Sequence, residues 1–220
     1  MVARLLQRRQ FREGQLHLRQ RDRQDERHQR CHHQREDRHA NASYAAANYT
    51  IVVQTYPSPL QPGSGIRYSQ SGYSRQGTGG CGFWNNDANW ANATALTIIN
   101  NAIKNAAAAS GANVKVLDLA ASFNGRRLCE NTVGLLEEKS LTSWTAATAV
   151  DKTEWMAQIR TVSTVFGPYY VQESLHSNYW GELAIRNCVR QAWNGGVPRG
   201  GVCNRGTGKT AAGEPNMTLA

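Results

Sequence analysis

The feature that most constrains the fold is a strand–helix–strand pattern between residues 48 and 119. Residues 48–57, NYTIVVQTYP, are rich in β-branched and aromatic residues, which is typical of a buried strand. Residues 87–110 have helical periodicity, and Gly111 is a suitable stop. One face of that helix carries Leu96, Ile99, Ile103 and Ala106. Residues 114–119, VKVLDL, predict a second strand, so we expect a parallel crossover and an α/β fold.

Two further helices are predicted in the second half of the chain. Asp151 and Glu154 resemble a capping box, and we expect a helix from Asp151 to Gly167-Pro168. Its apolar face would carry Trp155, Ile159, Val162 and Phe166. A last helix is expected over about 178–194, capped by Ser177 or Asn178 and closed by Gly195-Gly196.

The remaining segments have loop composition. Residues 60–86 are rich in Gly and Ser, and their aromatic residues and Cys81 favour an ordered, functional loop over a disordered one. Residues 197–220 have the composition of a tail, tethered only if Cys203 is bonded. We therefore divide the chain into residues 1–40, a folded region over 41–205, and a C-terminal tail over 206–220.

The N-terminal segment carries most of the excess positive charge. The chain has a net charge of +9, and residues 1–39 hold eleven of its 25 basic residues, six of its 16 acidic ones and five of its six histidines. Such a segment is a basic RNA-binding arm or His-rich metal tract, a solvated disordered tail, or a frameshifted reading of a GC-rich gene. We favour the frameshift, because the segment has many Arg and no Lys. The rest of the chain has a net charge of only +4 (9 − 5), so the folded region is expected to bind no nucleic acid.

The cysteines indicate an oxidising compartment. Cys81, Cys129, Cys188 and Cys203 form an even set without the CxxC spacing of a zinc site, whereas Cys31 lies in the N-terminal segment. We expect two disulfides, with buried free thiols as the alternative, and hence a secreted parent protein. We expect no signal peptide in these residues, because no apolar stretch follows the charged N-terminus, and no membrane span, because no run approaches ~18 apolar residues.

The segment ESLHSNYWG at residues 173–181 is the candidate for chemistry. His176 is the single histidine after residue 39, and Glu173 lies three residues before it. In a tight loop that carboxylate reaches the imidazole Nδ1–H, which leaves Nε2 free to take a proton from a hydroxyl nucleophile. A lone His beside a Glu is more often a surface or packing residue. We expect no metal and no cofactor. The sequence GTGKT at residues 206–210 resembles the end of a phosphate-binding loop, but the full pattern needs Gly at position 203, where this chain has Cys203.

Several segments, in order, resemble the SGNH/GDSL hydrolase family, in particular its secreted actinobacterial branch. They are YPSPL, GGCGFWNNDANWAN, FNGRRLCE and ESLHSNYWGELAIRNCVRQAWNGG. The resemblance implies a three-layer, flavodoxin-like α/β fold with a parallel sheet, whose N-terminal part is missing here. It implies ester hydrolysis by a Ser-His-acid mechanism, with His176 as the general base. Glu173 stands where the family usually has Asp, and Ser177 where it often has Pro.

The family's other catalytic blocks are not found. The chain contains neither the GDS motif that carries the nucleophilic serine nor a GxND block, so we expect a truncated hydrolase lacking its nucleophile. The resemblance further implies a Cys81–Cys129 disulfide near the active-site mouth, which leaves Cys188 and Cys203 as the second pair. The substrate would be a lipid, an acylated sugar or a small ester. The alternatives are a catalytically dead remnant that acts as a binding protein, or a nucleic-acid binder that uses the basic arm.

Overall fold

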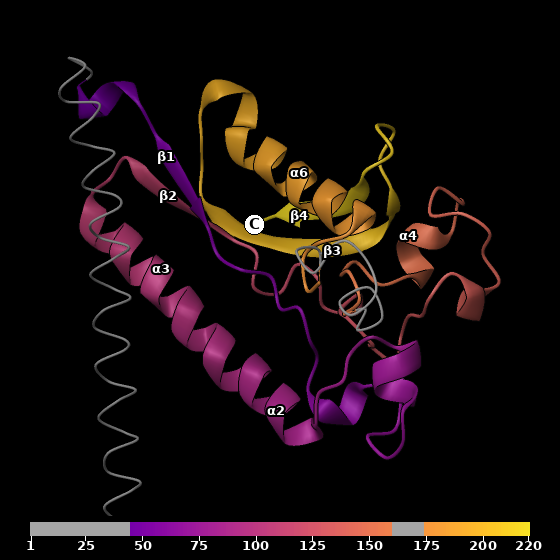
Figure 1. The fold of residues 1–220 in the computed structure, drawn as a ribbon. Helices are drawn as coiled ribbons and strands as arrows, with labels where there is room; N and C mark the ends of the chain where they lie inside the picture. The colour runs from indigo at the N-terminus through magenta and orange to yellow at the C-terminus, as the bar shows by residue number, and fades with distance from the viewer. Residues whose placement is uncertain (1–44, 160–173) are drawn as a thin grey trace, which may run out of the picture.

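The structure is a computed structural model that describes residues 45–159 and 174–220. It is a mixed α/β fold around a four-stranded sheet in the order β1-β2-β3-β4 (Figure 1). The strands are β1 (Ile51–Gln54), β2 (Val114–Asp118), β3 (Gly201–Lys209) and β4 (Pro215–Leu219). The first three run parallel, and β4 pairs antiparallel with β3. The α/β fold predicted from the sequence is thereby confirmed.

The crossover between β1 and β2 follows the predicted pattern. Its helical run consists of α2 (Asn85–Trp90), a π-helical turn η4 (Ala91–Ala95) and α3 (Leu96–Ser110). Gly111 ends the run with a φ of 112°, a left-handed conformation that glycine adopts without strain. In the sheet, Ile51 lies opposite Val114 and Gln54 opposite Leu117.

The last helix, α6 (Tyr179–Trp193), is capped by one of the two residues predicted for that role. The side chain of Asn178 accepts hydrogen bonds from the backbone N–H groups of Trp180 and Gly181, which satisfies donors that a helix start leaves free. The helix ends at Asn194, and a short 3₁₀ turn η7 (Asn194–Gly196) follows. Figure 1 shows α3 and α6 on opposite sides of the sheet.

Shorter helical pieces fill the loops. They are the 3₁₀ turns η1 (Ala46–Asn48), η2 (Gly63–Gly65) and η5 (Glu137–Lys139), the π-helical turn η3 (Ser74–Thr78) and the short helix α4 (Ala149–Lys152). The long loop over 60–86 is ordered by Arg75, whose buried guanidinium donates to the carbonyl oxygens of Tyr68 and Phe83. No helix within 45–159 or 174–220 is long and apolar enough to cross a bilayer.

The helix predicted to begin at Asp151 is wrong over its described part. Helix α4 ends at Lys152, and Thr153 is extended. The backbone of Trp155 donates to the carbonyl of Arg126, while the indole packs edge-on against Phe123 with ring centroids 5.6 Å apart. Glu154 does not cap a helix, because its buried carboxylate accepts from the N–H of Cys129 and pairs with Arg67. Val162 and Phe166 lie outside the described residues.

The C-terminal tail expected over 206–220 is also wrong. These residues complete β3 and form all of β4, a hairpin whose side chains Met217 and Leu219 are buried in the main core. The buried carboxylate of Glu214, just before β4, pairs with Arg186 and Arg190 of α6. The hairpin therefore belongs to the sheet.

Two disulfides connect the predicted cysteine pairs. Cys81 is bonded to Cys129, and Cys188 of α6 is bonded to Cys203 of β3. All four side chains are fully buried. The second bond fastens the last helix to the strand that follows it.

Candidate functional site

His176 is held by a short antiparallel contact between two loops. The N–H of Leu175 donates to the carbonyl of Ala157, and the N–H of Ala157 donates back to the carbonyl of His176. A bridge between Met156 and Ser177 continues this pairing up to the start of α6. The position of His176 therefore follows from backbone hydrogen bonds, not from packing of the exposed imidazole itself.

The residue before the histidine has an unusual backbone conformation. Leu175 has a φ of 62°, in the left-handed region that costs an L-residue other than glycine about 1–2 kcal/mol. The surrounding hydrogen bonds hold it there, and its side chain lines the same pocket as His176. Strain of this kind is often retained at functional sites.

The imidazole has one hydrogen-bond partner in the described part of the chain. Its Nδ1 lies 3.2 Å from the carbonyl oxygen of Ser174. A carbonyl can only accept, so this contact is a hydrogen bond when Nδ1 carries the proton, and Nε2 then presents its lone pair as a base. Glu173, expected to orient His176 from the same side, lies outside the described residues.

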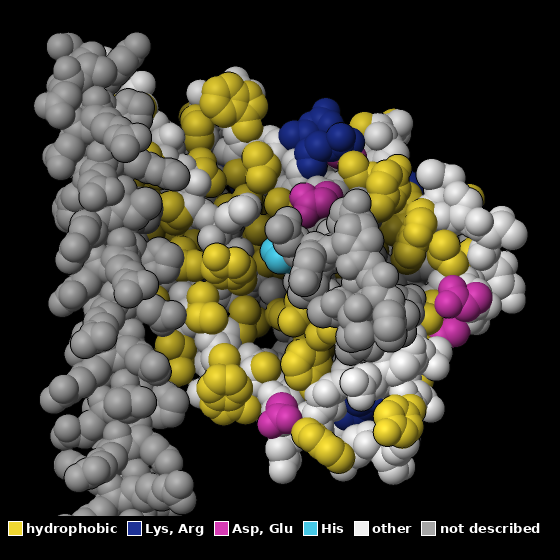
Figure 2. Space-filling model, in the orientation of Figure 1, with side chains coloured by type: hydrophobic (Ala, Val, Ile, Leu, Met, Phe, Trp, Pro, Cys, Tyr) yellow, Lys and Arg dark blue, Asp and Glu magenta, His cyan; other side chains and the backbone are white. Residues whose placement is uncertain are grey.

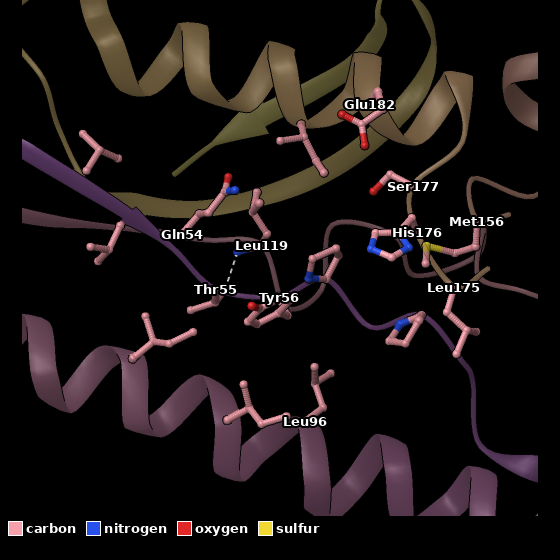
Figure 3. A pocket seen from close by; sticks show the side chains of 17 residues that line it. Gln54, Thr55, Tyr56, Leu96, Leu119, Met156, Leu175, His176, Ser177 and Glu182 are labelled. Carbon is pink, nitrogen blue, oxygen red and sulfur yellow. Dashed lines mark hydrogen bonds between the residues drawn. The ribbon is translucent and has the colours of Figure 1, made fainter. Parts of the chain in front are cut away.

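A pocket of about 770 Å³ opens beside His176 (Figure 3). Its walls come from the carboxyl end of β1, from α3 and from the first turns of α6. The lining is mostly apolar and includes Val53, Pro57, Leu96, Ile99, Ile103, Leu119, Met156, Leu175 and Ile185. Its polar members are Gln54, Thr55, Tyr56, His176, Ser177 and Glu182. Pockets at the carboxyl ends of parallel strands are the usual ligand sites of open α/β sheets.

A buried hydrogen-bond network forms the sheet side of this pocket. The hydroxyl of Thr55 donates to Oδ1 of Asp118 at 2.8 Å and accepts from the N–H of Leu119 at 2.7 Å. Lys104 of α3 pairs with the other carboxylate oxygen of Asp118. Burial alone would raise the pKa of Asp118, but the hydrogen bonds from Lys104, the N–H of Ala120 and Thr55 outweigh it and lower that pKa. Asp118 is therefore a fixed anion.

Among the residues that follow His176, Ser177 carries the first hydroxyl, but that hydroxyl is not hydrogen-bonded to the imidazole. Figure 3 shows Ser177 on the α6 side of the imidazole, next to Glu182. No hydroxyl or thiol of the described residues is hydrogen-bonded to His176, whose described partner is the backbone of Ser174. The described residues thus place an imidazole beside a pocket, with no described hydroxyl or thiol hydrogen-bonded to it.

The sequence analysis identified His176 but missed most of the pocket. Gln54, Thr55 and Tyr56 were included in a predicted strand without a role, and Glu182 was not singled out. Two signals were available: the end of a parallel strand marks a ligand site, and Glu182 follows the cap residue Asn178 by one helical turn. Neither disulfide contributes to the pocket lining, although the resemblance implied that Cys81–Cys129 lies near the site mouth.

The fold and the site together define a mixed α/β protein with a mostly parallel sheet and a histidine-bearing apolar pocket at its strand ends. Within the residues that the structure describes, no three His, Cys, Asp or Glu side chains are grouped so that they could hold a metal ion. No protein-family model, no curated protein and no solved structure matches the chain.

Proposed function

We propose that the chain contributes the general-base side of an ester hydrolase of the SGNH/GDSL type, with His176 as the base. The observation that carries this proposal is the hydrogen bond between Nδ1 of His176 and the carbonyl of Ser174 at the pocket. It supports the tautomer with the proton on Nδ1, whose Nε2 accepts a proton from a hydroxyl as that hydroxyl attacks the ester carbonyl. The same nitrogen then returns the proton to the departing alkoxide.

The pocket suits the acyl part of an ester. Its apolar walls, with Leu96 and Ile99 on α3 and Ile185 on α6, favour a hydrocarbon chain over a charged one. Its volume of about 770 Å³ is within the range of small-molecule sites. His176 and Ser177 lie where the polar ester group would meet the protein.

The mechanism also needs a nucleophilic hydroxyl, and no described residue bonded to His176 supplies one. We propose that a residue other than those described around His176 provides it. The parallel strands β1, β2 and β3 support a flavodoxin-like architecture, and the outer edge of β1 pairs with no described strand. The two disulfides support an oxidising, extracellular setting for this protein.

The test is the intact mass of the folded chain after treatment with a serine-reactive fluorophosphonate, beside His176→Ala. A label on the wild type that His176→Ala lacks supports the base role, and peptide mapping then names the serine. Ser143→Ala is the matched control, because Ser143 does not line the pocket and its hydroxyl pairs with Thr145, and it should keep the label. If circular dichroism shows a folded wild type that gains no label, the chain does not catalyse by itself.

A binding role without catalysis is the second candidate. It is favoured because no described hydroxyl is hydrogen-bonded to the imidazole of His176. A binding protein should retain its affinity for an apolar carboxylate, such as octanoate, in His176→Ala. The third hypothesis, nucleic-acid binding, involves residues 1–39, which lie outside the described residues. It predicts affinity for RNA that falls steeply with salt and disappears when these residues are deleted.

A further inference from the structure

The outer face of the longest helical run has an unusual composition. From Asn86 to Asn105 the exposed positions recur every three or four residues, as expected for one face of a helix. We call these residues the polar stripe: Asn86, Trp90, Thr94, Thr97, Asn101 and Asn105. Asp87 is the one charged residue beside them that is exposed, since Lys104 is half-buried and paired with Asp118.

This composition lowers helix stability and is therefore informative. Asn and Thr are poorer helix formers than Lys, Glu or Ala, because their side chains compete for backbone hydrogen bonds or lose rotamer freedom. An exposed helix face that serves only for solubility normally carries charged residues of high propensity. The side chains of Asn86, Thr94 and Thr97 form no hydrogen bond to any described residue, so their polar groups are available to a ligand.

Trp90 is at the centre of the most exposed part of the stripe. Its side chain is 56% exposed, although a tryptophan is usually largely buried. On a helix its neighbours at three and four residues are Asn86, Asp87, Ala93 and Thr94. Three of them carry hydrogen-bonding side chains, and the fourth, Ala93, is too small to cover the indole. A flat apolar ring flanked by amide, carboxylate and hydroxyl groups offers both stacking and polar contacts.

Helix α2, which ends at Trp90, lies at the edge of the molecule (Figure 1). In Figure 2, exposed hydrophobic side chains lie beside an acidic one at the lower edge, where Figure 1 shows α2. The stripe then continues along α3 on exposed positions that do not line the pocket. An extended ligand could therefore lie along the helix without entering the pocket.

We propose that the polar stripe binds a neutral polysaccharide, with Trp90 stacking on the face of a sugar ring. The charge and chemistry of the stripe match this ligand, because pyranose rings are uncharged, present apolar C–H faces, and are ringed by hydroxyls that pair with amides and hydroxyls. A nucleic acid or an anionic lipid surface would need exposed Lys or Arg, and the stripe has none. From Trp90 to Asn105 the helix rises by about 22 Å, which is long enough for several sugar rings.

This site is separate from the pocket beside His176. The pocket is lined by Leu96, Ile99 and Ile103, which lie on the inward face of the same helix. The stripe residues do not line it, so binding at the stripe and chemistry at the pocket can be changed independently.

The experiment is a pull-down of the full chain on amorphous cellulose, colloidal chitin and insoluble starch. We expect binding to at least one of them, with Trp90→Ala weakening the affinity about tenfold or more. Trp193→Ala is the matched control, because Trp193 is 60% exposed but lies at the end of α6, away from the stripe. It should bind as the wild type does. The double variant Asn86→Ala/Thr94→Ala, which removes the polar groups on both sides of Trp90, should also bind less, while its helix content by circular dichroism does not fall.

Salt separates this binding from adsorption by the basic N-terminal segment. At about 1 M NaCl exposed charges are screened beyond ~3 Å, so binding through the stripe should persist. The proposal is overturned if none of the three polysaccharides retains the chain. It is equally overturned if high salt releases the chain, or if Trp90→Ala binds as strongly as Trp193→Ala.

Discussion

The side-chain amide of Asn100 binds both polar groups of the Tyr56 backbone. Its Oδ1 accepts from the N–H at 2.8 Å, and its Nδ2 donates to the carbonyl at 2.9 Å. The side chain of Asn100, on α3, thus makes the pair of backbone hydrogen bonds that a residue of a neighbouring strand would make. This pair holds the chain in place where it leaves β1 and lines the pocket. Asn100 is 4% exposed, so water cannot replace these bonds easily.

Replacing Asn100→Asp should destabilise the protein by about 3 kcal/mol or more. The carboxylate cannot donate to the carbonyl of Tyr56, and its charge would be buried facing that carbonyl. Urea unfolding at pH 7 measures the change, and Asn101→Asp, the same substitution at the exposed next position, should alter stability by no more than about 0.5 kcal/mol. Equal effects at the two positions would show that the contact with Tyr56 does not matter.

Replacing Thr55→Val should cost about 1–3 kcal/mol although the two side chains have nearly the same shape. The change leaves the buried N–H of Leu119 without an acceptor and removes one donor from Asp118. Denaturant unfolding measures the loss. Thr50→Val is the control, because Thr50 is exposed just before β1. A Thr55→Val protein as stable as the wild type would contradict a structural role for this hydroxyl.

Glu214 makes stability depend on pH in the acid range. Burial alone would raise the pKa of Glu214, but hydrogen bonds and charges from Arg186 and Arg190 outweigh it and lower that pKa. A carboxyl whose folded pKa is depressed stabilises the protein above its unfolded pKa of about 4.3, and this contribution is lost as pH falls through the folded pKa.

The comparison with Glu214→Gln tests this dependence. The variant should be less stable than the wild type at pH 7 by ~1–3 kcal/mol, because the hairpin then loses its charged link to α6. Thermal unfolding followed from pH 7 down to about pH 3 should show the two curves converge. A difference that stays constant across this range would refute the titration of Glu214 as its cause.

The two disulfides should contribute unequally to stability. Cys81–Cys129 closes a separation of 48 residues and Cys188–Cys203 one of 15. On the chain-entropy model, removing the first pair by double Ala substitution costs about 4 kcal/mol and removing the second about 3 kcal/mol. Urea unfolding of each double variant under non-reducing conditions measures both. A larger cost for Cys188→Ala/Cys203→Ala would mean that its link between α6 and β3 matters more than loop length.

The sequence determined the elements whose residues interact with near neighbours. The strand at Ile51–Gln54, the helix that Gly111 ends and the cap at Asn178 each follow from local periodicity or local hydrogen bonding. The histidine of the site could also be found, because His176 is isolated in the sequence after residue 39.

Only the tertiary structure decided the segments whose partners lie far away in the chain. Residues 153–157 fall within a helix predicted from apolar spacing that begins at Trp155, but hydrogen bonds to Arg126 and His176 hold them outside any helix. Residues 206–220 look like a polar tail, yet pairing with β3 and the Glu214 contacts to α6 make them part of the sheet. Local propensity is worth tenths of a kcal/mol per residue, so burial and long-range hydrogen bonds override it.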